Sequence, residues 1–132
     1  MPKQTHVPGE AFRYMENAKE LLKAASIEGN AYIDKKPVRE AFGTAYLAVL
    51  EAINETLIKK GLTVKQLPKS VDAYRAALQK HLYVNNGKLL RSFEILYDSL
   101  HIAGYYRGLL RNVSTVKDEI KAAEDFIKKL LN

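Results

Sequence analysis

The sequence predicts an all-α protein, an up-and-down bundle of four to five helices, and three observations carry this prediction. Apolar residues recur at steps of three and four in five segments, the spacing that places them on one face of a helix. Residues that start or end helices, such as Gly, Pro, Asn and Ser, separate these segments. No segment shows the sustained alternation of apolar and polar residues that a half-buried strand requires.

The first two helices are predicted over residues 10–28 and 37–60. Asp34 is a suitable N-cap for the second helix, and Pro37 fits its first turn, where an N–H group is not needed. Gly61 ends this helix. Its small residues form a ridge that lets another helix come close, so we expect it to be the central helix. The ridge consists of Ala41, Ala45, Ala48 and Ala52.

The third helix is predicted to follow Ser70 as its N-cap and to end near Tyr83. Residues 62–69, which precede it, are too short and too isolated to found a sheet. The last helix is predicted to be capped by Ser114 or Thr115. Its apolar stripe consists of Val116, Ile120, Ala123, Ile127 and Leu130.

The fourth helix, residues 88–110, follows a predicted turn at residues 85–87 and carries two apolar stripes where a surface helix needs one. The stripe expected in the core consists of Leu89, Phe93, Leu96, Leu100 and Ala103. The second stripe mixes charged and apolar residues, with His101 beside it: Arg91, Ile95, Asp98, Ile102, Tyr105 and Leu109. A solvated face does not need two isoleucines, and a buried face does not tolerate unpaired charges. We therefore expect the second stripe to contact another molecule.

Composition and charge restrict the class of protein. The chain has 132 residues and no cysteine, which favours a single domain over residues 1–132, with a loose tail at residues 1–9, in a reducing compartment. The longest apolar run, residues 45–50, is too short to span a membrane, so a cytoplasmic protein without membrane contact is expected. A net charge of +6 favours anionic partners, but its 21 basic residues are interleaved with 15 acidic ones, which is typical of a solvated helical surface.

Few residues suggest chemistry. The three histidines lie on different segments without the ligand spacing of a helical metal site, so neither a metal nor a cofactor is expected. Asp98 and His101 are three residues apart, which fits either a surface hydrogen bond or an acid–base pair. The sequence therefore assigns no catalytic residue, and Arg91 and His101 are the two candidates.

Tyr105, Tyr106 and Arg107 lie between Gly104 and Gly108 at the end of the fourth helix. Each glycine weakens a helix by roughly 1 kcal/mol relative to alanine, so we expect the helix to kink, loosen or end there. The tyrosines fit a partner interface, because an apolar ring with a wet hydroxyl is common at interfaces. Stacking on a nucleotide or RNA, with the arginine on a phosphate, and plain core packing are the alternatives.

Two segments resemble HEPN-domain proteins. In residues 45–62, AYLAVLEAINETLIKKGL, an alanine–tyrosine pair opens a ridge of small residues and the helix ends in lysine–glycine, as in the second helix of that family. Residues 90–131 are similar to its last two helices, a tyrosine-bearing helix end followed by a helix opened by serine and rich in alanine and glutamate. The resemblance implies a HEPN-like helical bundle and a homodimer through the equivalent of the fourth helix.

Known HEPN proteins include nucleotide-binding modules, partners of minimal nucleotidyltransferases and metal-independent RNases. In the RNases an arginine is closely followed by a histidine. Here Arg75 and His81 have such a spacing but lie on the third helix, whereas Arg91 is far from His101 on the fourth.

We therefore expect a non-catalytic helical interaction module that docks a protein partner or a nucleotide and forms a homodimer through its fourth helix. The interface residues are Arg91, Ile95, Asp98, Ile102, Tyr105, Tyr106, Arg107 and Leu109. One alternative is a metal-independent RNA endonuclease, in which His101 acts as general acid or base and Arg91 or Arg107 stabilises the phosphate. The other alternative is a nucleotide-binding partner of a minimal nucleotidyltransferase.

Overall fold

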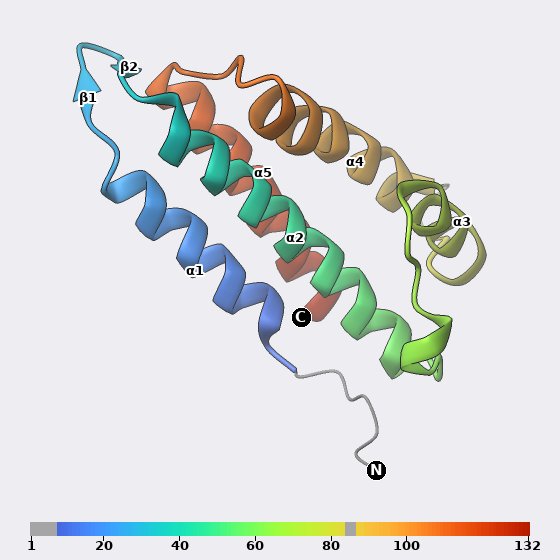
Figure 1. Cartoon of the computed structure of the whole chain (residues 1–132). Helices are drawn as coiled ribbons and strands as arrows, with labels where there is room; N and C mark the ends of the chain where they lie inside the picture. Colours follow the sequence, from blue (N-terminus) through green and yellow to red (C-terminus); the bar gives the residue numbers. More distant parts are fainter. Residues whose placement is uncertain (1–7, 84–86) are drawn as a thin grey trace.

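The computed structural model describes residues 8–83 and 87–132, which form a bundle of helices with one small hairpin (Figure 1). Its elements are α1 (Glu10–Lys23), β1 (Ile27–Glu28), β2 (Ala31–Tyr32), α2 (Lys35–Lys59), η1 (Val64–Gln66), α3 (Val71–His81), α4 (Lys88–Leu96), η3 (Tyr97–Tyr106) and α5 (Val113–Leu131). The all-α prediction is confirmed. Most of the predicted loose tail and of the predicted turn at 85–87 lies outside the described residues.

Helix α2 is central, as predicted, and packs against α1, η3 and α5 (Figure 1). Its ridge of alanines makes this possible, because side chains without long branches let neighbouring backbones approach. Ala41, Ala45, Ala48 and Ala52 are all fully buried. The side chain of Asp34 accepts a hydrogen bond of 3.0 Å from the backbone N–H of Lys36, so the predicted N-cap is also confirmed.

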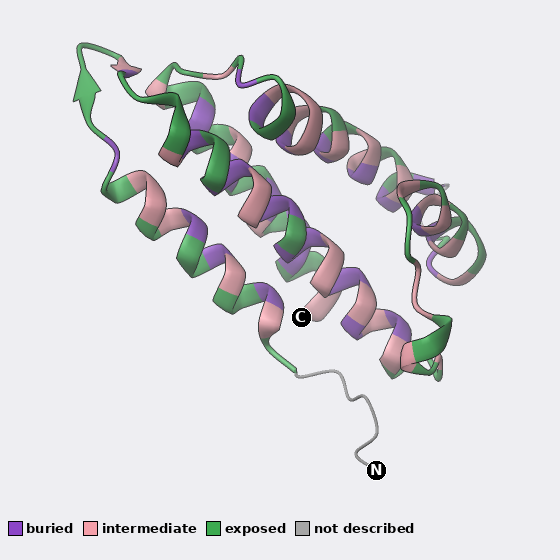
Figure 2. Ribbon diagram, viewed as in Figure 1, coloured by how far each residue is buried: buried purple, intermediate pink, exposed green. Residues whose placement is uncertain are grey.

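The core is built from one face of each long helix. Figure 2 shows the buried residues turned toward the interior of the bundle and the exposed ones on its outer surface. Fully buried large side chains come from α1, α2, α4, η3 and α5, including Met15, Phe42, Phe93, Leu100 and Ile127. Burying one such side chain stabilises the fold by roughly 1.5–3 kcal/mol, so these faces hold the bundle together.

The segment after α1 differs from the prediction. Helix α1 ends at Lys23 rather than near residue 28, and β1 and β2 form an antiparallel hairpin that turns at Gly29, where φ is 63°. The hairpin is tied to the start of α5, because the N–H of Tyr32 donates to the carbonyl oxygen of Arg111 at 2.9 Å. These tertiary hydrogen bonds override the local preference of this stretch for helix.

The other helix boundaries agree more closely with the sequence. The hydroxyl of Ser70 accepts a hydrogen bond from the N–H of Ala73 at the start of α3, as predicted. The cap of α5 was predicted wrongly: the side chain of Asn112, and not Ser114 or Thr115, accepts a hydrogen bond of 3.1 Å from the N–H of Thr115. No described helix combines the length and the apolar character that crossing a lipid bilayer requires.

The predicted fourth helix is one continuous rod, but its second half, η3, is a π-helix rather than an α-helix. A π-helix has hydrogen bonds across five residues and therefore more residues per turn, and it usually lasts a single turn. The buried positions accordingly repeat every four residues, at Leu96, Leu100 and Gly104. Ala103, which the α-helical pattern assigns to the core, is only partly buried. The rod ends at Gly108, where φ is 61°.

The π-helix lies very close to α2 at Gly104. A Cβ atom on this buried residue would lie 2.4 Å from Cγ of Phe42, much closer than two carbon atoms can approach without a shift. Glycine at this position is therefore required by the packing of η3 on α2, in addition to its effect on the helix.

We predict that Gly104→Ala lowers the free energy of unfolding by about 1–3 kcal/mol, the usual effect of overpacking a core. Alanine is intrinsically favoured over glycine in helices by about 1 kcal/mol. A loss of stability would therefore result from the collision of the new Cβ atom with the ring of Phe42 and not from helix propensity. Urea denaturation measures the effect. In a Phe42→Leu background the same substitution should cost less, because the ring is gone. An unchanged or higher stability of Gly104→Ala would contradict the prediction.

Candidate functional site

Four aromatic rings lie side by side where η3 meets α2, and we call them the aromatic wall: Tyr46, Tyr97, His101 and Tyr105. The ring centroid of His101 lies 4.9 Å from that of Tyr46, 5.5 Å from that of Tyr97 and 5.9 Å from that of Tyr105. These separations are typical of interacting aromatic pairs. The three rings from η3 align because the π-helix repeats every four residues.

The aromatic wall borders a groove along α2. The groove consists of three hollows of about 450, 490 and 290 Å³. The first and second hollows share Glu40 and Tyr105, and the second and third share Tyr46 and His101, so the three adjoin one another. Leu47 of α2 lies in the middle hollow, half exposed. The middle hollow offers a mostly apolar surface with few polar groups, as ligand sites commonly do.

Arginines hold the two ends of the aromatic wall. At one end the guanidinium of Arg39 donates to the carbonyl oxygens of Tyr105 and Tyr106, at 2.8 and 3.0 Å, and so satisfies backbone acceptors at the end of η3. At the other end the guanidinium of Arg75 lies 5.2 Å from the ring centroid of Tyr97, and its Nε donates to the carboxylate of Glu94 at 2.8 Å. The wall is therefore a fixed surface.

The groove has a basic end beside Tyr105. Lys35, Lys36 and Arg39 line the first hollow, together with the acidic side chains of Asp34 and Glu40. The middle of the groove has a different character, because its lining there is mostly apolar and aromatic. The arrangement can hold a flat apolar group against the wall and an anionic group at the basic end.

We give the name outward face to Arg91, Ile95, Asp98, Ile102 and Tyr106 of the α4–η3 rod, none of which lines the groove; all are exposed except Ile102, which is partly buried. Ile95 is 67% exposed and Tyr106 is 69% exposed, and Leu109, just beyond the rod, is 60% exposed. Ile95 also lines a hollow of about 280 Å³ beside Phe126 of α5.

The second stripe expected from the sequence is therefore wrong as a single face. It assumes α-helical geometry throughout, whereas in the π-helix Tyr105 and His101 line the groove and Ile102 is partly buried. Ile95, on the preceding α-helix, is exposed. Asp98 is exposed, and among the described residues it makes no hydrogen bond with His101, so the acid–base pair is not formed. Arg107 and Leu109 follow the rod and are exposed.

The two candidate catalytic residues do not meet within one subunit. Arg91 and His101 are ten residues apart on the same rod, which corresponds to roughly 15 Å at the rise of an α-helix. His101 is surrounded by tyrosine rings, while Arg91 lies on the exposed side of α4. Within residues 8–83 and 87–132, no cluster of three or more His, Asp or Glu side chains could hold a metal ion.

Sequence reasoning missed several residues of the site. The sequence patterns place Tyr46 in the core and not in a functional site, and they predict neither the place of Tyr97 beside it nor the contact of Arg39 with the end of η3. The signal that could have found the wall is the repeat of Tyr97, His101 and Tyr105 at steps of four, which fits a wider helix than the α-helix.

Burial raises the pKa of the Tyr46 hydroxyl. Desolvation is the main cause that raises the pKa of its hydroxyl to about 12, and the neighbouring hydroxyl of Tyr97 adds to it. Tyr46 is therefore neutral at physiological pH and presents the groove with an uncharged ring and hydroxyl.

Comparison with known proteins identifies a family and a similar solved structure. A family model described as Domain of unknown function (DUF5618) matches residues 6–132. The chain is similar to a solved structure of a protein of unknown function from Dyadobacter fermentans, with 31% sequence identity and a TM-score of 0.73, over 92% of this chain and 89% of that chain. No curated protein matches the chain. The similarity thus covers nearly the whole bundle and not one part of it.

We predict that Tyr46 makes stability depend on pH in the alkaline range. Its pKa is about 12 in the folded protein and 10.0 in its ordinary state, so the folded protein keeps a proton that the unfolded chain loses. The contribution of this raised pKa to the free energy of unfolding is complete below about pH 10 and is lost as the pH rises toward 12. Urea denaturation between about pH 9.5 and 11.5 should therefore show a smaller fall in stability for Tyr46→Phe than for the wild type.

The matched control for this experiment is Tyr106→Phe, because the side chain of Tyr106 is exposed. This variant should lose stability with pH as the wild type does. An identical pH dependence for Tyr46→Phe and the wild type would contradict the raised pKa.

Proposed function

The chain belongs to the family Domain of unknown function (DUF5618), and from its geometry we propose that it is a non-catalytic helical interaction module that pairs with a second copy of itself. The observation that carries the proposal is the exposure of Ile95 at the centre of the outward face, between Arg91 and Asp98. Tyr106, at the end of the rod, and Leu109, just beyond it, are also exposed. Large apolar side chains gathered on one exposed element are typical of interaction sites.

The charges of the outward face favour a second copy as the partner. Arg91 and Asp98 have opposite signs and lie on either side of Ile95. A two-fold axis brings the same patch of two subunits together, so antiparallel rods would place Arg91 of each copy beside Asp98 of the other. The resemblance of the sequence to HEPN proteins separately predicts a dimer through this helix. That prediction supports the proposal.

We predict that the protein is a dimer at micromolar concentration, with about twice the 14.9 kDa mass of one chain in light scattering. Ile95→Glu should raise the dissociation constant at least tenfold, because it places a charge without a partner in the interface. Leu47→Glu is the matched control, since Leu47 is 50% exposed but lies in the groove. A monomeric wild-type protein at tens of micromolar would reject the proposal.

A charge exchange tests the symmetry of the interface. Asp98→Arg alone and Arg91→Glu alone should each weaken the dimer, since each places like charges across the two-fold axis. The double variant should recover most of the lost affinity, because the opposite charges then meet again. Additive losses in the double variant would contradict the antiparallel arrangement.

A second candidate function is nucleotide binding in the groove, and one observation favours it. The rings of His101 and Tyr105 are stacked at 17° beside the hollow that Lys35 and Lys36 line. A base can stack on such rings while its phosphates pair with the lysines. This site is compatible with a dimer, because it lies on the groove side of the rod.

We predict that a nucleotide at a hundredfold excess over its dissociation constant stabilises the folded protein by about 2.7 kcal/mol. Thermal unfolding with ATP, GTP and AMP measures this effect. Tyr105→Ala should abolish the stabilisation, whereas Tyr106→Ala, on the outward face, should preserve it. The absence of a shift with all three nucleotides would remove the second candidate.

A further inference from the structure

A separate hollow of about 390 Å³ lies between α1 and α5, beside the β1–β2 hairpin. Its volume is in the range of small-molecule sites, and none of its lining residues belongs to the groove or to the outward face. The apolar part of the lining comes from all three elements and the turn after α1: Leu22, Ala25, Ile27, Tyr32 and Ile120. Ile27 is 49% exposed, so the hairpin presents an apolar side chain at its rim.

The charged part of the lining is strongly basic, with four lysines and one glutamate. Lys19 and Lys23 are one turn apart on α1, and Lys117 and Lys121 are one turn apart on α5. Because α1 and α5 run in opposite directions and Lys19 contacts Glu124, Lys19 lies at the end of the hollow away from the hairpin (Figure 1). Lys23 and Lys117 lie closer to the hairpin than Lys19 does, and Lys121 lies at about the height of Lys23.

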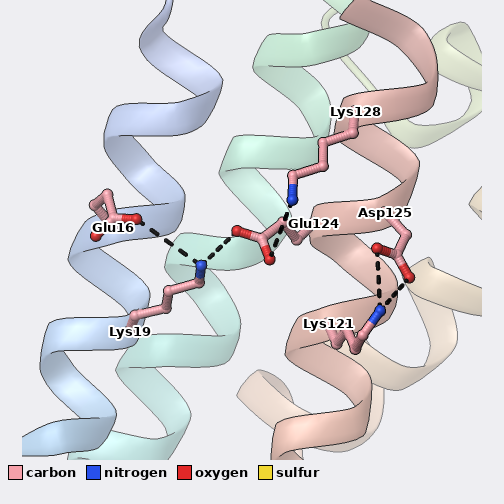
Figure 3. Close-up of polar contacts among 6 residues, drawn as sticks. All are labelled: Glu16, Lys19, Lys121, Glu124, Asp125 and Lys128. Carbon is pink, nitrogen blue, oxygen red and sulfur yellow. Dashed lines mark hydrogen bonds and ion pairs between the residues drawn. The ribbon is translucent and has the colours of Figure 1, made fainter. Parts of the chain in front are cut away.

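Two of the four lysines, Lys19 and Lys121, already have anionic partners. Figure 3 shows Lys19 reaching from α1 to Glu124 of α5, with Glu16 on its other side, and Lys121 turned toward Asp125. The hydrogen bond to Glu124 raises the pKa of Lys19, so this lysine keeps its charge. The pair of Lys19 and Glu124 joins the two helices across the seam and closes the end of the hollow away from the hairpin.

The other two lysines have no such partners. Among the described residues, neither Lys23 nor Lys117 makes an ion pair, although both line the hollow. Two like charges at one site repel each other, and an anion between them would relieve the repulsion. An apolar group that covers the apolar surface beside these lysines would bind favourably, because both apolar surfaces are then removed from water.

We propose that this hollow binds a single-chain amphiphile with an anionic head group. The head group pairs with Lys23 and Lys117, and the apolar tail lies against Leu22, Ile27 and Ile120. Because the hairpin bounds one end and the Lys19–Glu124 pair the other, the hollow suits a short ligand and not an extended peptide helix.

Calorimetry on the full chain tests the ligand class, with decanoate below its micelle-forming concentration as the probe. Decanoate should bind saturably with one molecule per chain. Octanoate should bind roughly tenfold more weakly, since each buried methylene contributes about 0.8 kcal/mol. Decanol, with the same tail but no charge, should also bind about tenfold more weakly, and acetate, with the charge but no tail, should not bind.

Two sets of variants test the site. Lys23→Gln with Lys117→Gln should weaken decanoate at least tenfold and leave decanol unchanged, whereas Lys65→Gln with Lys80→Gln removes the same charge from exposed positions elsewhere and should leave both unchanged. Ile27→Asn should weaken both ligands. Its matched control is Ile33→Asn, since Ile33 is 52% exposed and does not line the hollow. Circular dichroism checks that each variant is folded.

Three outcomes would overturn the proposal. One is the absence of saturable binding of decanoate to the wild type. Another is an equal loss in the hollow variants and their matched controls, which would show attraction to the net charge only. The third is binding to phosphatidylglycerol vesicles without binding to monomeric decanoate, which would assign the lysines to a membrane surface.

Discussion

The close approach of η3 to α2 is the constraint on which the rest of the site depends. It requires a residue without a side chain at Gly104, because a Cβ there would meet the ring of Phe42. A second glycine, Gly43 on α2, makes room in the same way for the ring of Tyr105, to which a Cβ would come within 2.8 Å. The two glycines thus let the π-helix lie on α2 and bring the aromatic wall against the groove.

Most of the fold could be predicted from the sequence because local signals and packing agree there. The alanine ridge of α2 predicts a central helix, and both the caps at Asp34 and Ser70 and the apolar stripe of α5 are found as expected. The stretch after Lys23 could not be predicted, because its hairpin depends on hydrogen bonds with residues 111–113, far away in the sequence. The helix propensity of a segment contains no information about hydrogen-bond partners that are distant in the sequence.

The site was less predictable than the fold, and the reason is one change of helical geometry. A stripe read at the α-helical period places Tyr105 and Ile102 on the same face, whereas the π-helix separates them by turning Tyr105 toward α2. The same error produced the expected pair of Asp98 and His101. The face that each of these residues occupies depends on the packing of η3 against Phe42 and Gly43.

The separation of the two faces also gives the functions that the sequence suggested different structural requirements. An RNase of the HEPN type needs an arginine and a histidine at the dimer seam. A dimer through the outward face would bring two copies of Arg91 to the seam and leave both copies of His101 in their grooves, stacked on tyrosines. If the dimer forms as proposed, the nuclease mechanism would therefore require a different interface. Binding of a flat ligand by the aromatic wall needs neither an Arg91–His101 pair nor an Asp98–His101 pair. Stacking uses the faces of the rings and involves no proton transfer.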